Sequence, residues 1–181
     1  MAHPLDKFSC CPVCGSKRFA EHNFKSKACA DCGFVYYANP SAATAAFILN
    51  PRNELLVVRR GKEPAKGTLD LPGGFCDMYE TVEEGMCREI REETGIEVSV
   101  ADIRYLFSSP NVYRYSDMDI HTLDMDFLVR IRGRLPAVSA ADDAADARWI
   151  PLSQVCPQEF GLTSIRNAVI RFLTEVEGRI V

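Results

Sequence analysis

The sequence predicts an α+β domain that is preceded by a small module held together by cysteines. Three observations lead to this prediction: two Cys-x2-Cys pairs near the start, apolar strand-like segments separated by turns, and an acidic amphipathic helix among those segments. About 140 residues follow the cysteine module, enough for one hydrophobic core. We therefore expect the module over residues 1–38 and the domain over residues 39–181.

The module is defined by two cysteine knuckles, each followed by glycine and separated from each other by 14 residues. This spacing is typical of four-thiolate zinc sites. We predict a zinc ribbon in which structural Zn²⁺ is held by Cys11, Cys14, Cys29 and Cys32. Cys10 is an alternative to Cys11, but the Cys-Pro-x-Cys-Gly form favours Cys11. Disulfides of a secreted protein are the other interpretation, which the absence of a signal peptide in the first nine residues disfavours.

The charge distribution argues against general nucleic-acid binding. The chain has a net charge of −4; residues 1–38 carry a net +2 and the remaining residues a net −6. An acidic domain repels phosphate backbones, and its excess carboxylates suit a divalent cation. No apolar run approaches the roughly 20 residues that cross a bilayer. We expect no membrane partner and a cytoplasmic location.

The elements of the larger domain follow from its apolar pattern. After a junction at residues 38–40, strands are expected at 44–49, 54–59, 103–108, 120–131 and 147–150. A turn at residues 50–53 joins the first two strands, and an Ala- and Asp-rich loop at 139–146 precedes the last. A closing helix is expected over residues 164–177, where Gly178 is a natural stop and the apolar residues keep helical period: Ile165, Ala168, Val169, Phe172, Leu173 and Val176.

An acidic helix is expected after the turn Leu71-Pro72-Gly73-Gly74. At about 100° per residue, three carboxylates project from one arc, those of Glu89, Glu92 and Glu93, while Val82, Met86 and Ile90 form an adjoining apolar stripe. The carboxylates repel one another, and hard oxygen ligands of this kind suit Mg²⁺ or Mn²⁺. Gly85 lies on the same arc, where the missing side chain leaves room for an ion and a phosphate.

An ordinary solvated acidic face is the alternative interpretation of this helix. The two glycines immediately upstream disfavour it, because they permit a close ligand approach that other residues would obstruct.

Residues 74–96, GFCDMYETVEEGMCREIREETGI, fit a longer template without a mismatch. In this template Gly is followed after five residues by Glu, and after seven more by Arg-Glu-aliphatic-x-Glu-Glu-x-Gly-aliphatic. The segment resembles the Nudix box, and the chain is similar to the Nudix hydrolases. The resemblance implies an α/β/α sandwich with a mixed sheet, and metal-dependent attack of water on a nucleoside diphosphate linked to another group.

The resemblance also implies residue roles. Glu89, Glu92 and Glu93 would ligate Mg²⁺ or Mn²⁺ together with the Gly73 carbonyl, and Glu89 is also a candidate base. Arg88 and Glu80 would orient the other residues. One departure is Tyr79, where the family often has Gly, which puts the path of the loop in question.

The segment Ser108–Ser116 bears on the substrate. In the NADH pyrophosphatase branch of the family, which also carries a four-cysteine ribbon, a Ser-Gln-Pro-Trp-Pro-Phe-Pro-x-Ser motif has a comparable place. Here only the first Ser, the Pro, the aromatic at Tyr113 and the last Ser match. Aromatic rings can hold a base and Arg114 can meet a phosphate. The candidate substrate residues are Phe75, Tyr113, Arg114 and Tyr115, although alternate strand packing also explains the two tyrosines.

A further acid, Asp146, stands where the same branch often has Glu before Ala-x-Trp. It is a candidate additional metal ligand or base, and a surface acid at a strand edge is the alternative. Glu159, in the loop before the last helix, is a rival base because Nudix enzymes recruit that role from different loops.

The sequence therefore predicts a Mg²⁺- or Mn²⁺-dependent pyrophosphatase that cleaves a dinucleotide such as NAD(H), or ADP-ribose, into two monophosphates. The alternatives are a non-catalytic nucleotide-sensing regulator and a hydrolase of NAD-capped RNA ends. Family resemblance alone implies a homodimer.

Overall fold

The computed structural model describes residues 3–133 and 144–176, and it divides into two compact units. One unit comprises Met1–Ser41 with Val112–Thr122, and the other comprises Ala42–Asn111 with Leu123–Val181. Within the described ranges, no helix combines the length and the apolar character needed to span a membrane.

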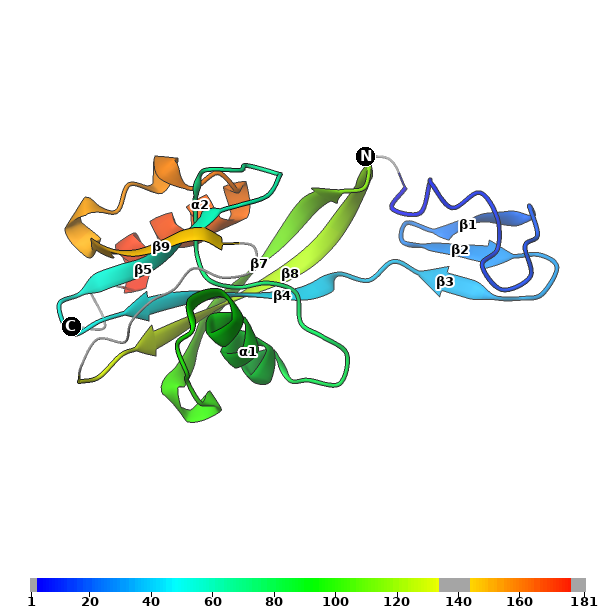
Figure 1. Ribbon diagram of the computed structural model, residues 1–181. Helices are drawn as coiled ribbons and strands as arrows, with labels where there is room; N and C mark the ends of the chain where they lie inside the picture. The colour runs from blue at the N-terminus through cyan, green and yellow to red at the C-terminus, as the bar shows by residue number, and fades with distance from the viewer. Residues whose placement is uncertain (1–2, 134–143, 177–181) are drawn as a thin grey trace. The chain divides into compact units, whose positions relative to one another are not determined.

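The first unit contains a three-stranded antiparallel sheet in the order β1-β2-β3 (Figure 1), formed by β1 (Phe19–Asn23), β2 (Ser26–Cys29) and β3 (Val35–Tyr37). Its core is small: buried Cys11, Phe19 and Cys29, with Phe8 and Phe34 packed against them. Because these few apolar side chains give little hydrophobic stabilisation, a module of this size usually needs a metal or disulfides.

A mixed six-stranded sheet is the centre of the second unit, with β6-β5-β4-β8-β7 in order and β9 paired with β5. β5 is antiparallel to β4, β6 and β9, whereas the arrows of β4 and β8 point the same way in Figure 1. The strands are β4 (Ser41–Leu49), β5 (Glu54–Arg60), β6 (Leu69–Asp70), β7 (Ile103–Tyr115), β8 (Met118–Arg130) and β9 (Ala144–Pro151).

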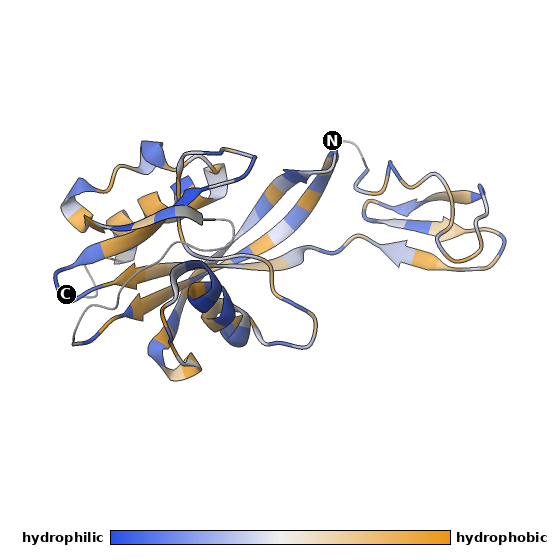
Figure 2. Ribbon diagram, viewed as in Figure 1, coloured by the Kyte–Doolittle hydropathy of each residue, from blue (hydrophilic) through white to orange (hydrophobic). Residues whose placement is uncertain are grey.

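The two faces of this sheet bury different residues, because neighbouring side chains of a strand point to opposite sides. In β4, Ala46 and Ile48 pack with Met86 and Ile90 of helix α1 (Val82–Thr94). Phe47 and its neighbours on the other face pack with helix α2 (Thr163–Arg171) and with Phe172, whose ring stacks on Phe47 at 4.2 Å. The sheet therefore lies between two helices, as the predicted α/β/α sandwich requires. Figure 2 shows the outward face of α1 as largely hydrophilic.

Most predicted elements are present, with three differences. The strand expected at 103–108 continues to Tyr115, where a turn at Ser116–Asp117 leads into β8. The closing helix is α-helical only to Arg171 and then continues as a π-helical segment, Phe172–Val176; Gly178 lies outside the described residues.

The loop predicted at 139–146 is wrong for its last three residues. Ala144, Ala145 and Asp146 belong to β9, where Ala144 pairs with Arg60 and Asp146 with Arg59. Alanine and aspartate have low strand propensity, so pairing with β5 rather than local preference determines this part of the strand. Residues 139–143 lie outside the described part of the chain.

Short helical turns complete the second unit. They are η1 (Val100–Asp102), η2 (Leu152–Gln154) and η3 (Pro157–Glu159). η3 leads to the fully buried Phe160, which forms a parallel bridge with Leu69 of β6. The segment before α2 is thereby fixed to the strand that leads into the glycine loop.

Candidate functional site

Helix α1 begins and ends with specific backbone signals. The Thr81 side chain accepts a hydrogen bond from the Glu84 amide, and the Glu84 carboxylate accepts one from the Thr81 amide, which completes a capping box. At the other end, Gly95 adopts φ 72° and its amide donates to the Arg91 carbonyl. These caps fix the register of the acidic face between them.

The loop before α1 lies along β4 through alternating hydrogen bonds. The carbonyls of Pro72 and Gly74 each accept an amide hydrogen from β4 at 2.8 Å. A Cβ atom on Gly73 would lie 2.1 Å from the Thr44 carbonyl oxygen, so only glycine fits this close approach. Because Pro72 and Gly74 direct their carbonyls to β4, the extended chain turns the peptide groups of Gly73 to the opposite side. The Gly73 amide indeed donates to the Glu93 carboxylate at 3.0 Å.

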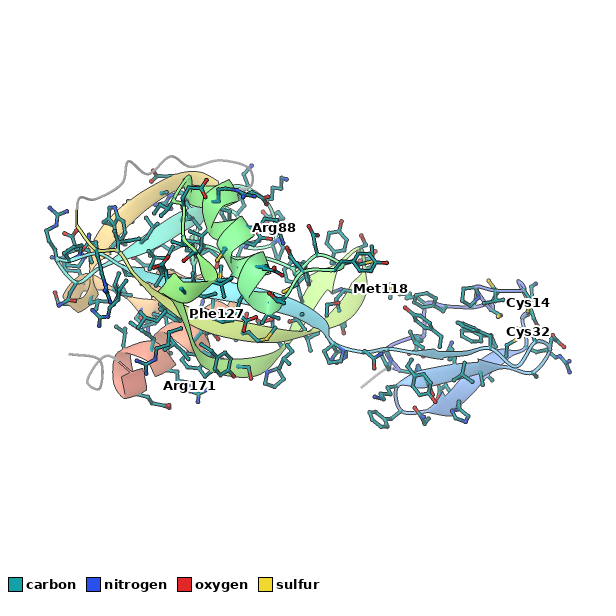
Figure 3. All side chains as sticks on the ribbon, turned by 90° about the horizontal axis from the view of Figure 1, so that it is seen from below. Cys14, Cys32, Arg88, Met118, Phe127 and Arg171 are labelled. Carbon is teal, nitrogen blue, oxygen red and sulfur yellow. The ribbon has the colours of Figure 1, made fainter. Side chains whose placement is uncertain are left out.

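Arg88, which is labelled in Figure 3, joins the loop to the acidic helix. Its guanidinium contacts Glu80 at 2.8 Å, Glu89 at 2.8 Å and Glu92 at 3.1 Å, and donates to the Phe75 carbonyl at 3.0 Å. The hydrogen bonds that Arg88 donates to Glu80 are the main reason that the pKa of Arg88 is raised. One permanent cation therefore holds three of the predicted site residues and the loop backbone together.

The carboxylates of this network differ in environment. Burial raises the pKa of Glu89, and Arg88 only partly opposes that rise. The hydrogen bonds from Arg88 instead lower the pKa of Glu80. Glu92 is more exposed than either of them. Glu80 of the loop and Glu89 of the helix, which share Arg88, therefore have pKa values shifted in opposite directions.

The predicted ligands fit a hard divalent cation by donor chemistry. Glu89, Glu92 and Glu93 provide carboxylate oxygens from one helix face, and Gly73, in the loop beside them, offers its backbone carbonyl. Among the residues that the structure describes, the three carboxylates do not all lie within 4.8 Å of one another. Arg88 holds Glu89 and Glu92, and the Gly73 amide holds Glu93.

Gly85 has a different role from the predicted one. A Cβ atom there would lie 2.7 Å from a Glu80 carboxylate oxygen and 3.4 Å from the Cys76 sulfur. The space left by the missing side chain is therefore filled by Glu80, not open to an ion or a phosphate. A Cβ on Gly74 would likewise meet the Glu89 carboxylate at 2.6 Å. Both glycines allow the acids to approach the backbone.

Tyr79 does not disturb the loop path. It adopts φ 73°, the left-handed conformation that glycine adopts most easily, and its side chain is 104 % exposed. The loop continues directly into Glu80 and the helix cap.

The candidate substrate residues lie in two places. Phe75 is exposed in the loop before α1. Tyr113 and Tyr115 lie in β7, with ring centroids 6.4 Å apart and nearly parallel planes, and Arg114 forms an ion pair with Asp119 of β8 at 2.6 Å. The three β7 residues belong to the unit that contains the ribbon, so their role toward a substrate of the acidic helix stays a prediction.

The two rival bases are exposed and occupy different elements. Asp146 lies in β9 opposite Arg59, and Glu159 ends η3 next to buried Phe160. Neither is a hydrogen-bond partner of Arg88, which donates to Glu80, Glu89, Glu92 and the Phe75 carbonyl. The structure thus brings Arg88 and its acids together and places Asp146 and Glu159 outside that group.

Sequence reasoning missed two partners of Arg88. The Phe75 carbonyl is a backbone group that carries no sequence signal, and the Asp77 carboxylate lies 3.6 Å from the guanidinium. Asp77 is an acid within the box, three residues before Glu80, which is the only signal that could have indicated it.

The four predicted cysteines converge in the first unit. Their sulfur atoms lie within 4.8 Å of one another, with Cys11 3.7 Å from Cys32 and Cys14 3.6 Å from Cys29. Figure 3 shows Cys14 and Cys32 next to each other. No disulfide joins any of the eight cysteines in the structure, and the four sulfur atoms form one cluster. A tetrahedron with metal–sulfur bonds of about 2.3 Å has edges near 3.8 Å, so the cluster suits one metal ion.

Comparison with known proteins places these features in a family. The profile of the NUDIX domain matches residues 39–173. An ADP-ribose pyrophosphatase of Methanocaldococcus jannaschii is 34 % identical over 119 residues, which cover 66 % of each chain. The NAD-capped RNA hydrolase NudC of Vibrio atlanticus is 28 % identical over 84 % of this chain and 53 % of its own. The chain spans between about half and two thirds of the length of these relatives.

Solved structures agree on the fold. A NUDIX hydrolase from Nitrosomonas europaea superposes with a TM-score of 0.67 at 18 % identity, over 94 % of this chain and 93 % of that one. A MutT/nudix family protein from Enterococcus faecalis has a TM-score of 0.55 at 26 % identity, over 63 % of this chain and 44 % of that one. With the family profile covering most of its length and the acidic helix intact, this chain belongs to the NUDIX family.

Proposed function

We propose that this protein is a metal-dependent pyrophosphatase that hydrolyses a nucleoside diphosphate linked to another moiety. The observation that carries the proposal is the network around Arg88, which holds Glu89 and Glu92 of α1 and Glu80 of the preceding loop together beside Gly73. An acidic helix without a chemical role would not need a shared guanidinium that is anchored to the loop backbone.

A divalent cation bound at this face would neutralise diphosphate charge and make bound water acidic. We propose Mg²⁺ or Mn²⁺ as that cation, with Glu89, Glu92, Glu93 and the Gly73 carbonyl as its ligands. Burial of Glu89 favours its taking up a proton from the attacking water. Arg88 orients the Glu89 carboxylate, and Glu80 keeps the guanidinium in position from its other side.

The substrate we propose is ADP-ribose or a dinucleotide of the NAD(H) type, cleaved to two monophosphates. The names of the two curated relatives, an ADP-ribose pyrophosphatase and an NAD-capped RNA hydrolase, support this choice. Tyr113, Arg114 and Tyr115 only partly match the NADH pyrophosphatase motif, so we expect hydrolysis of ADP-ribose to equal or exceed that of NADH. Asp146 and Glu159 are the rivals of Glu89 for the role of general base.

A second candidate is hydrolysis of NAD-capped RNA ends, which the NudC relatives favour. It requires the same diphosphate cleavage with a longer leaving group. The net −6 charge of residues 39–181 argues against extended RNA contacts, so we rank it below the small nucleotides.

In the first unit, we propose structural Zn²⁺ on Cys11, Cys14, Cys29 and Cys32. The sulfur distances support this assignment. A homodimer in a cytoplasmic location completes the proposal.

The test is a panel of nucleoside diphosphate derivatives, incubated with Mg²⁺ or Mn²⁺ and resolved by chromatography. ADP-ribose should yield AMP and ribose 5-phosphate, and NADH should yield AMP and reduced nicotinamide mononucleotide. Binding of these compounds without turnover in either metal would contradict the proposal and favour a sensor. A kcat/KM for NADH tenfold above that for every other compound would overturn the substrate ranking.

A further inference from the structure

The loop between Gly74 and α1 exposes three apolar side chains beside the acidic helix. Tyr79 is 104 % exposed, Met78 85 % and Phe75 46 %. In Figure 1 this loop extends beyond the amino-terminal end of α1. Large apolar groups in water contribute nothing to the core, so their presence here calls for another explanation.

Among these three residues, Tyr79 has the most unusual backbone conformation. Its φ of 73° lies in the left-handed region, which a bulky residue adopts at a cost and glycine adopts freely. The exposure of the ring shows that packing within the described chain does not compensate for that cost. Strain of this kind, held beside a candidate active site, is a reason to look for a role in ligand binding.

The loop is held in place even though its side chains are exposed. The Cys76 amide donates to the Ala42 carbonyl at 3.1 Å, and the Asp77 amide donates to the Glu80 carboxylate at 2.6 Å. Arg88 binds the Phe75 carbonyl and Glu80. Residues on both sides of Tyr79 in the chain are therefore held by hydrogen bonds. Its backbone position is defined before any ligand binds.

We propose that Tyr79 is a specificity-determining residue whose ring stacks on the planar base of the nucleotide cleaved at the acidic helix. The inference rests on the proposed function and adds the group that selects the nucleoside end of the substrate. One ring face is enough to stack a base. A protein partner would need roughly 800 Å² of surface, far more than three side chains of one short loop offer, so a base is the better fit.

Kinetics of Tyr79→Gly, Tyr79→Phe and the wild type on ADP-ribose test the proposal. Tyr79→Gly should raise KM about tenfold and leave kcat unchanged, because stacking is lost while the acids remain. Tyr79→Phe should restore the wild-type KM. Glycine suits the φ of this position, so Tyr79→Gly should fold with an equal or higher melting temperature. Phe24→Ala, which removes an exposed aromatic from the β1–β2 turn, is the control and should not change KM.

A diphosphate that joins two ribose units without a base separates this proposal from the proposed function. Its KM should be the same for wild type and Tyr79→Gly. An unchanged KM for ADP-ribose in Tyr79→Gly, or an equal rise for the base-free compound, would overturn the role of Tyr79 while leaving the pyrophosphatase assignment intact. A change in oligomeric state of Tyr79→Gly in sedimentation, with KM following it, would assign the ring to self-association instead.

If the wild type shows no turnover, calorimetric binding of ADP-ribose with Ca²⁺ in place of Mg²⁺ still tests Tyr79. The proposal then predicts a Kd about tenfold higher for Tyr79→Gly than for the wild type. Equal affinities, or no binding to the wild type, would overturn it.

Discussion

The cysteine cluster and the acidic helix are both candidate metal sites, but they are built in opposite ways. In the ribbon, four sulfur atoms already lie close together over a core of only a few side chains. On α1, Arg88 binds Glu89 and Glu92 and the Gly73 amide binds Glu93, above a well-filled core that includes Met86 and Ile90. From this difference we expect a metal to stabilise the fold of the ribbon, whereas the larger unit should fold without a metal and bind one only for its activity.

The largest effect is expected from Cys29→Ser in the ribbon. A structural zinc ion accounts for most of the folding free energy of so small a module, so losing one thiolate should release the metal and unfold it. Elemental analysis should find stoichiometric zinc in the wild type and little in the variant. Amide exchange should show lost protection in β1–β3 and unchanged protection in β4–β9.

Cys10→Ser is the matched control for that experiment. Cys10 is exposed and adjacent to a knuckle, outside the cluster of four sulfur atoms. It should retain zinc and normal exchange. A Cys29→Ser protein that keeps its zinc and melts normally would remove the first half of the comparison.

Arg88→Gln tests whether the larger unit needs the Arg88 guanidinium to hold its acids in place. The change leaves Glu80 and Glu89 without their main partner, so we expect the melting temperature at pH 7 to fall by several degrees. Arg88 keeps the pKa of Glu80 below the value that this carboxyl has in the unfolded chain. Such a shift stabilises the fold at pH values above the unfolded pKa, and this stabilisation is lost as the pH falls through the folded pKa. The difference between variant and wild type should therefore shrink as the pH falls below about 4.5, the ordinary pKa of a glutamate.

Arg91→Gln, on the exposed side of the same helix, is the control and should melt like the wild type. Equal melting of Arg88→Gln and Arg91→Gln at pH 7 would show that the guanidinium does not hold the acids together.

Asp126 is a buried acid of the larger unit. It is 1 % exposed in β8, and among the described residues its Oδ1 has no hydrogen-bond partner. Burial, reinforced by Asp124 and opposed by Arg171, raises its pKa to about 8. Arg171 instead pairs with Glu175 at 3.1 Å. We therefore expect Asp126 to be protonated in the folded protein at neutral pH.

The prediction for Asp126→Asn follows from the sign of that shift. A raised carboxyl pKa means that the unfolded chain releases its proton first, so the free energy of unfolding should fall as the pH rises from about 4 to about 8, by a few kcal/mol in order of magnitude. Asp126→Asn should remove that slope in denaturant unfolding, whereas exposed Asp146→Asn should keep it. A wild-type protein equally stable at pH 5 and pH 8.5 would contradict the prediction.

The smallest effect concerns Tyr113, in the hairpin segment grouped with the ribbon. If it stacks on a base, Tyr113→Ala should weaken productive binding by roughly 1 to 3 kcal/mol and leave kcat unchanged. If it serves packing against Tyr115, the change should lower the melting temperature instead. Kinetics and melting of one variant separate the two outcomes.

Local patterns predicted which residues group together in both regions better than they predicted the sheet. The helical period placed Glu89, Glu92 and Glu93 on one face, and cysteine spacing identified the four thiols, because both depend on short sequence separations. The strand at Ala144–Asp146 was missed because it depends on pairing with β5, more than 80 residues away. The hydrogen bond from Arg88 to the Phe75 carbonyl was missed because any residue type can supply a backbone carbonyl, so the sequence carries no signal for it.

The central claim is that the acids held by Arg88 perform metal-dependent hydrolysis, and Glu92→Gln tests it most directly. Glutamine keeps the size and removes one charge that a cation would use. With saturating Mg²⁺ and ADP-ribose, kcat should fall by about 100-fold or more, while the melting temperature stays the same because the clustered carboxylates repel one another. Glu83→Gln, in the first turn of the same helix and outside the Arg88 network, should keep wild-type turnover. Full activity of Glu92→Gln under these conditions would contradict the account.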